Sequence, residues 1–218
     1  MSDNTSPYFA AEYDLQISKN LPYYSVFHEE TLDLIKTIHP KPDKWLDTGC
    51  GTGRFVQKAS CVFGNTTFFL ADPSKKKLAI AENINRNTFE KSTAELDFTD
   101  STFDVVTAIL SHHYLSREQR RLSTINCFRM LKENGVYVTF ENILPATPKG
   151  QEIIMERWLR YKLKNNNAVD ESSHFSRFNQ DYFPITIAAH LDLLHEAGFQ
   201  TAELFWMSYM QAGFFAIK

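Results

Sequence analysis

An acidic residue followed by alternating glycines is the part of this chain best suited to chemistry. Asp47 ends an apolar stretch, and Gly49, Gly51 and Gly53 follow it at every second position. Glycine permits positive φ and, because it lacks a Cβ, lets a ligand lie directly against the backbone. A helix beginning at Arg54 would direct its first amides and its positive dipole end at the occupant of the turn. The pattern predicts a nucleotide-type cofactor site at the carboxyl end of the first strand of an α/β sheet.

The glycine spacing separates two kinds of cofactor site. Dinucleotide enzymes carry Gly-x-Gly-x-x-Gly, whereas this turn reads Gly-x-Gly-x-Gly with a carboxylate two residues before it. A negative charge there suits a cationic ligand group better than a pyrophosphate. The turn resembles motif I of the class I S-adenosylmethionine-dependent methyltransferases, whose cofactor carries an ammonium and a sulfonium but no phosphate. The resemblance implies that S-adenosyl-L-methionine contacts Asp47, Gly49, Cys50, Gly51 and Gly53; a tight turn without a ligand is the alternative.

Later segments fit the same family and extend the expected cofactor site. Asp72 and Pro73 end the second strand, where a carboxylate can accept both ribose hydroxyls, although it would do so for NAD as well or could merely cap a helix. In the family an acidic residue that receives the adenine amino group usually occupies the position of Thr93. Because this chain departs from that pattern, either Glu95 takes over this role or backbone groups of Ala94 and Glu95 recognise the adenine. Ser111, after the fourth strand, completes the expected set.

Two histidines and a carboxylate are the candidates for acid–base work. His112 and His113 follow the fourth strand, where the resemblance puts the family's motif IV at the rim of the active site. Neighbouring side chains diverge there, so only one imidazole can face the cofactor methyl, and the other is expected to be structural. Imidazole titrates near neutrality and could take a proton from a hydroxyl or an amine. Glu141, just beyond the fifth strand, is the competing candidate.

Alternating strand and helix patterns predict the elements that position these residues. The last two strands are too close in sequence for a crossover helix and must form an antiparallel hairpin. We therefore expect a doubly wound, mostly parallel α/β sheet of seven strands, and the resemblance implies the order 3-2-1-4-5-7-6 with the last strand antiparallel. Strands are expected at 44–47, 66–71, near 89–92, 103–110, 136–140, 202–207 and 214–217, and helices at 54–63, 75–85, 117–131, 151–164 and 187–197.

The remaining segments divide the chain. Residues 1–40 are expected to form an N-terminal helical cap and residues 41–218 the cofactor-binding domain, with a substrate-lid insertion at about 145–183. Loops at strand ends carry function in such folds, so the acceptor should meet these two additions. Their many aromatic residues indicate a small-molecule methyl acceptor that is partly apolar and closed off from water; the alternative is that these residues simply pack the lid.

Composition limits the setting. The chain has 218 residues, a net charge of −3 and three cysteines, which disfavours nucleic acid as a substrate and favours a reducing, cytoplasmic location. No signal-peptide core is visible in the first thirty residues, and no apolar run approaches the roughly 18 residues of a membrane-spanning helix. A monomer or a homodimer is expected.

Three other interpretations are weaker. A metal site built from His28, His112, His113 and His174 lacks ligand spacing, so no metal is expected. An NAD-dependent dehydrogenase would need its third glycine elsewhere and a Tyr-x-x-x-Lys pair, which the chain lacks at Tyr161. A non-catalytic binding module that keeps the fold is the second alternative to an enzyme, but the intact Asp47, glycines and Asp72 argue against it.

Overall fold

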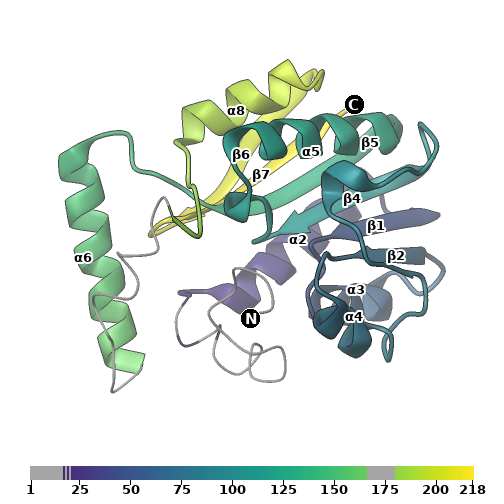
Figure 1. Ribbon diagram of the computed structural model, residues 1–218, viewed down its shortest axis with the longest axis horizontal. Helices are drawn as coiled ribbons and strands as arrows, with labels where there is room; N and C mark the ends of the chain where they lie inside the picture. Colours follow the sequence, from purple (N-terminus) through teal and green to yellow (C-terminus); the bar gives the residue numbers. More distant parts are fainter. Residues whose placement is uncertain (1–16, 18, 20, 166–179) are drawn as a thin grey trace.

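The computed structural model describes residues 17, 19, 21–165 and 180–218, and a mixed seven-stranded sheet forms its centre (Figure 1). The strand order is β3-β2-β1-β4-β5-β7-β6. The strands β1 to β5 pair in parallel, whereas β7 pairs antiparallel with both β5 and β6. The predicted order and the predicted antiparallel strand are confirmed. The strands are β1 (Lys44–Thr48), β2 (Thr67–Ala71), β3 (Thr88–Phe89), β4 (Phe103–Ile109), β5 (Leu131–Asn142), β6 (Thr201–Ser208) and β7 (Gln211–Ile217).

Helices cover both faces of this sheet, which explains why its central strand has no polar face. In β4 every side chain from residue 103 to residue 108 is buried, as expected of a parallel strand that is covered on both sides. One core cluster joins α2, α3 and α4 to one face, and another joins α5 and α8 to the other (Figure 1). The helices are α2 (Tyr24–Ile38), α3 (Arg54–Val62), α4 (Lys75–Ala81), α5 (Arg117–Met130) and α8 (Ile187–Glu196).

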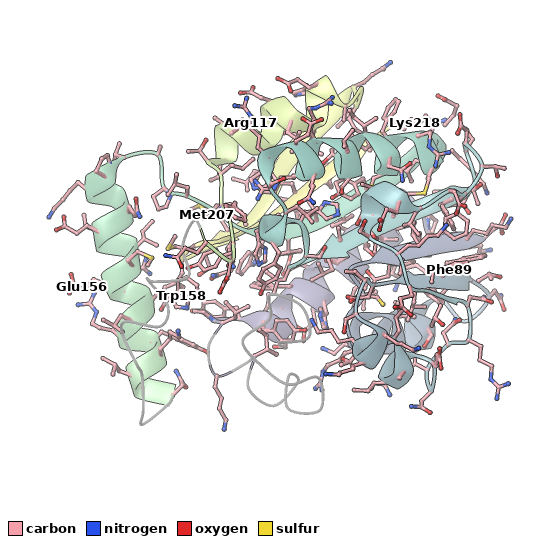
Figure 2. All side chains as sticks on the ribbon, viewed as in Figure 1. Phe89, Arg117, Glu156, Trp158, Met207 and Lys218 are labelled. Carbon is pink, nitrogen blue, oxygen red and sulfur yellow. The ribbon has the colours of Figure 1, made fainter. Side chains whose placement is uncertain are left out.

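Helix α6 (Pro148–Asn165) stands at one side of the molecule, away from the sheet (Figure 1). Figure 2 shows Trp158 on the side of this helix that faces the rest of the molecule and Glu156 on the opposite side. Trp158 is buried in a third apolar cluster with Phe27 of α2 and Phe140 of β5. One indole thus anchors the helix to the body of the protein.

Several element boundaries differ from the sequence-based expectation. Strand β7 begins at Gln211 and not at residue 214, helix α6 begins at Pro148 and not at residue 151, and Glu141, expected just beyond the fifth strand, lies within β5. The helix expected to reach residue 85 ends at Ala81, because the chain turns there to pair the short β3 with β2. The fifth strand, expected at 136–140, begins at Leu131, which pairs with Phe103 before a register shift restores the regular ladder at Val136. An extra stretch of chain that contains Gly135 is accommodated at this irregularity.

The predicted division at residue 40 and the predicted lid at 145–183 stay predictions. Part of each, residues 1–16 and 166–179, lies outside the described residues. Within the part that is described, α2 packs against α3 and β5, so it shares a core with the sheet. None of the described helices is long and apolar enough to cross a membrane.

Candidate functional site

A cavity of about 210 Å³ lies at the carboxyl ends of β1, β2 and β4. This is the edge of an open α/β sheet at which ligands bind. This volume is below the usual range for small-ligand pockets, so part of a bound ligand would extend toward solvent. Its wall consists of Tyr24, His28, Asp47, Gly49, Cys50, Gly51, Thr52, Arg54, Phe55, Asp72, Pro73, Lys77, Ser92, Thr93, Ile109, Leu110, Ser111, His112, Tyr114 and Leu115.

The glycine turn forms the floor of this cavity, and its glycines have different structural roles. All three have positive φ: 64° at Gly49, 58° at Gly51 and 80° at Gly53. A Cβ at Gly49 would lie 2.3 Å from the Cβ of Ser111, whereas a Cβ at Gly51 would meet nothing within 4 Å. Gly49 is therefore required by packing. Gly51 leaves open space beside the backbone, as a ligand cradle requires.

Asp72 ties the glycine turn to the end of β2. One carboxylate oxygen accepts a hydrogen bond from the amide of Gly51 at 2.9 Å, and the other accepts one from the amide of Ser74 at 2.8 Å. Ser74 in turn caps α4 by accepting from the amide of Lys77. The carboxylate is 3% exposed and lines the cavity. It therefore shapes the turn and also presents negative charge to a ligand.

Asp47 provides a second carboxylate, which a hydrogen bond from Thr107 holds in place. Its Oδ1 accepts a hydrogen bond of 2.6 Å from Thr107, whose hydroxyl also accepts from the Trp45 indole at 3.0 Å. Burial, opposed by the Thr107 hydrogen bond and reinforced by the charge of Asp72, raises the pKa of Asp47 to about 7. A cationic group in the cavity would favour the ionised form. The position of Asp47 therefore favours a ligand that brings a cationic group to this side of the cavity.

Cys50 lies between these two carboxylates, and its thiol is not a nucleophile. Burial and the charges of Asp47 and Asp72 raise the pKa of Cys50 well above its ordinary value. Reactive cysteines need the opposite shift, because the thiolate is the reactive form. The residue serves as a small side chain in a crowded turn.

His112 reaches the cavity, but both of its ring nitrogens have partners. Nε2 lies 3.0 Å from the hydroxyl of Thr93, and Nδ1 lies 3.1 Å from the phenol of Tyr137. Thr93 continues the chain of hydrogen bonds to Thr48 at 2.6 Å. Burial lowers the pKa of His112 to about 4, although the charge of Glu141 partly opposes the shift. The imidazole is neutral at physiological pH and links β1, β5 and the loop after β3.

Glu141 and His113 lie behind the cavity wall, not in it. The Glu141 carboxylate accepts from the backbone amides of His112 and His113, from the ring of His113 and from the hydroxyl of Thr139. Burial alone would raise its pKa, but the His113 hydrogen bond and the charges of His113 and His112 lower the pKa to about 2. The carboxylate is thus a buried anion that holds the short helix η2 (His112–Tyr114) against β5. Its hydrogen bonds favour a positioning role.

The structure brings together most of the residues predicted for the cofactor. Asp47, Gly49, Cys50, Gly51, Asp72, Pro73 and Ser111 line one cavity, as does His112. Gly53 starts α3 beneath the turn. Ala94 and Glu95 do not line the cavity, and the exposed Glu95 instead closes a capping box with Ser92. Ser92 and Thr93 occupy the wall in that region. The roles assigned to these residues stay predictions.

The sequence does not indicate the contribution of α2 to the cavity. Tyr24 and His28 line the cavity from this helix, and their rings lie 5.0 Å apart. Their helical spacing was visible in the sequence, yet nothing local shows that this helix face meets a turn more than twenty residues away. Among the described residues no group of three or more His, Cys, Asp or Glu could hold a metal ion; His174 lies outside them.

Comparison with known proteins points to one family. A family model described as a methyltransferase domain matches residues 46–135, which contain the glycine turn and Asp72. The carboxy-S-adenosyl-L-methionine synthase of Staphylococcus epidermidis is 20% identical over 215 residues, covering 96% of this chain and 93% of its own.

Solved structures share the fold. An S-adenosylmethionine-dependent methyltransferase of Archaeoglobus fulgidus superposes with a TM-score of 0.69 at 13% identity, covering 98% of this chain and all of that chain. Human N-acetylserotonin methyltransferase, solved in complex with S-adenosylmethionine, gives a TM-score of 0.65 at 13% identity; this chain is covered to 98% but spans only 59% of the human chain.

Proposed function

Because the chain is a class I S-adenosylmethionine-dependent methyltransferase, we propose that it transfers the methyl group to a small-molecule acceptor in the cavity at the glycine turn. The observation that carries this proposal is the open space over Gly51, flanked by the carboxylates of Asp47 and Asp72. These carboxylates favour a ligand that brings hydrogen-bond donors and positive charge to this part of the cavity. S-adenosylmethionine carries both.

The residues of the turn fit this cofactor in their chemistry. Asp72 already accepts two amides, and a carboxylate has lone pairs for further donors such as ribose hydroxyls. Asp47, whose pKa is about 7, gains its full charge when an ammonium group approaches. Ser92 and Thr93 offer hydroxyl and backbone groups in the wall nearby.

The chain's own contribution to the reaction is alignment and exclusion of water. When bound, S-adenosylmethionine supplies an electrophilic methyl group on a sulfonium. Tyr24, Phe55 and Leu110 give the cavity apolar surface, which desolvates the reacting groups and holds them in line. Of the two histidines predicted as bases, His112 is the one that lines the cavity. His113 and Glu141 lie behind the cavity wall and hold the backbone at His112 in place.

A small acceptor in the cytoplasm completes the proposal. The apolar side chains of Tyr24, Phe55 and Leu110 in the cavity wall favour a small, partly apolar acceptor, and the net charge of −3 gives no general attraction to nucleic acid.

Two measurements test the proposed function. Calorimetric titration with S-adenosylhomocysteine should give micromolar-range binding, and Asp72→Ala should weaken it by about 1–3 kcal/mol, the scale of hydrogen bonds to a charged group. The second measurement is release of S-adenosylhomocysteine from S-adenosylmethionine across a panel of small-molecule acceptors. Binding of NAD without binding of S-adenosylhomocysteine would overturn the proposal.

A second candidate function comes from the curated relatives, which are named carboxy-S-adenosyl-L-methionine synthases and align with nearly the whole chain. The observation that favours it is the pair Arg54 and Lys77 in the cavity wall, because a carboxylated cofactor would need a cation. Mass spectrometry of small molecules released from the denatured protein separates the two candidates. Carboxylated cofactor would support synthase activity, whereas S-adenosylmethionine or S-adenosylhomocysteine alone would support methyl transfer.

A further inference from the structure

The cavity has two walls that come from different parts of the chain. The glycine turn and the ends of β2 and β4 contribute the carboxylates Asp47 and Asp72. Helix α2 and the start of α3 contribute Tyr24, His28 and Phe55. The cofactor chemistry discussed above uses the first wall and leaves the second without an assigned partner.

His28 is the buried polar residue of the second wall, which also contains the phenol of Tyr24 and the guanidinium of Arg54. Its side chain is 2% exposed and lies among aromatic rings, with ring centroids 5.0 Å from Tyr24 and 5.3 Å from Phe55. Its Nδ1 is buried and has no hydrogen-bond partner among the described residues. Most buried polar groups have such a partner, and one without it destabilises the fold. A phenylalanine would fill this place better, so packing does not explain the imidazole.

The charges around His28 determine which ligand charge is favoured beside its ring. Burial, and then the positive charges of Lys58 and Arg54, lower the pKa of His28 to about 3. The ring is therefore neutral at physiological pH and can both donate and accept a hydrogen bond. The same two cations oppose a further positive charge beside the ring, whereas Asp47 and Asp72 attract positive charge to the other wall.

We propose that α2 supplies the acceptor subsite, where His28 hydrogen-bonds to a neutral or anionic small molecule that carries a hydroxyl or carboxylate on an apolar body. This proposal rests on the proposed function, since it assumes that the cofactor occupies the glycine-turn wall. Tyr24 and Phe55 cover the apolar body of the acceptor, and His28 fixes its polar group. His28 is thus a positioning residue for the acceptor, and cationic amines of the same size are excluded.

The test uses the full chain labelled with ¹⁵N-histidine and saturated with S-adenosylhomocysteine. A fragment library of size-matched neutral, anionic and cationic aromatic compounds, such as 4-hydroxyphenylacetate and tyramine, is screened by the shifts of the histidine ring resonances. Neutral and anionic fragments should shift His28, and cationic ones should not. His28→Phe should weaken the best fragment by about tenfold, the worth of one hydrogen bond to a polar group. His28→Gln should restore part of that loss.

Stability separates positioning from structure. Because His28→Phe removes a buried unpaired nitrogen, its melting temperature should equal or exceed that of the wild type. The matched control is His190→Phe, which removes another buried unpaired ring nitrogen, stacked 4.8 Å from Phe214. His190 lies near His112 and Glu141 but does not line this cavity. This variant should leave fragment and S-adenosylhomocysteine binding unchanged.

Each remaining outcome decides the matter. If no fragment shifts the His28 resonances, or if cationic fragments bind best, the acceptor subsite is overturned. Normal S-adenosylhomocysteine binding in that case would leave the proposed function intact. Absence of S-adenosylhomocysteine binding would overturn the proposed function itself.

Discussion

One oxygen of Glu141 accepts two hydrogen bonds from His113: 2.7 Å from the backbone amide and 2.9 Å from ring Nδ1. The second oxygen accepts from Thr139 at 2.7 Å and from the amide of His112 at 3.3 Å. A carboxylate saturated in this way fixes the backbone after β4 at the cavity rim. Removal of this carboxylate should therefore lower the stability of the fold more directly than it lowers catalytic activity.

Glu141→Gln should lower the free energy of unfolding by about 3 kcal/mol, because an amide group would face donors that now meet a buried anion. Urea denaturation measures this. Since the folded pKa of Glu141 is depressed to about 2, its stabilisation is present above its ordinary pKa near 4.5 and is lost as the pH falls toward 2. The variant should lack that acid dependence. Glu118→Gln, at an exposed ion pair with Arg121, is the control and should change stability little. A variant that is fully stable yet inactive would instead favour the predicted catalytic role of Glu141.

His112→Asn should leave S-adenosylhomocysteine affinity nearly unchanged and lower turnover by roughly 10²-fold or more, the scale of a lost general base. The pH–rate profile gives the sharper check. Because burial lowers the pKa of His112 to about 4, kcat/KM should fall as the pH drops through that value, and the variant should lose this limb. An unchanged turnover in both His112→Asn and His113→Asn would make the pair structural.

The affinity for S-adenosylhomocysteine should fall as the pH drops below about 7. Asp47 has its pKa raised to about 7, so at lower pH it must release a proton before it can pair with the ligand's ammonium group. The loss should approach about tenfold per pH unit, the limit for one linked proton. Calorimetry between pH 5.5 and 8, values chosen to bracket the pKa of about 7, measures it. Asp47→Asn should bind weakly with no such slope; a slope that persisted in the variant would assign it to another group.

Gly51→Ala should weaken S-adenosylhomocysteine binding, because the added methyl enters the open space over the turn. The φ of 58° adds a strain of about 1–2 kcal/mol for an L-residue, visible as a lower melting temperature. Gly64→Ala is the control: that glycine is exposed, and its added Cβ would come no closer than 4.0 Å to Ser60. Wild-type affinity in Gly51→Ala would show that the ligand does not lie on this turn.

The fold was predictable where the signal is local. The apolar run of β4 predicts a buried parallel strand, and the short segment 208–213 expected between the last two strands predicts an antiparallel hairpin. The glycine turn with its preceding carboxylate was equally local. The end of α4 and the start of β5 were not, because pairing with distant strands sets both boundaries.

The candidate site was predictable only on its glycine-turn side. His112, His113 and Glu141 were candidates from their places after the fourth and fifth strands, but their hydrogen bonds, and hence which of them reaches the cavity, depend on tertiary contacts across β4 and β5. The position of His28 in the cavity wall depends on how α2 packs against α3. No sequence period encodes that docking.

The origin of the cavity's second wall in α2 has a consequence for evolution and engineering. The proposed methyl-donor site lies at strand ends that also carry the core, where a substitution risks the whole fold. The proposed acceptor wall sits on a helix that precedes the sheet in the chain. Exchanging residues along its inner face, or grafting the helix from a relative, offers a route to new acceptors that leaves the sheet and the methyl donor site as they are.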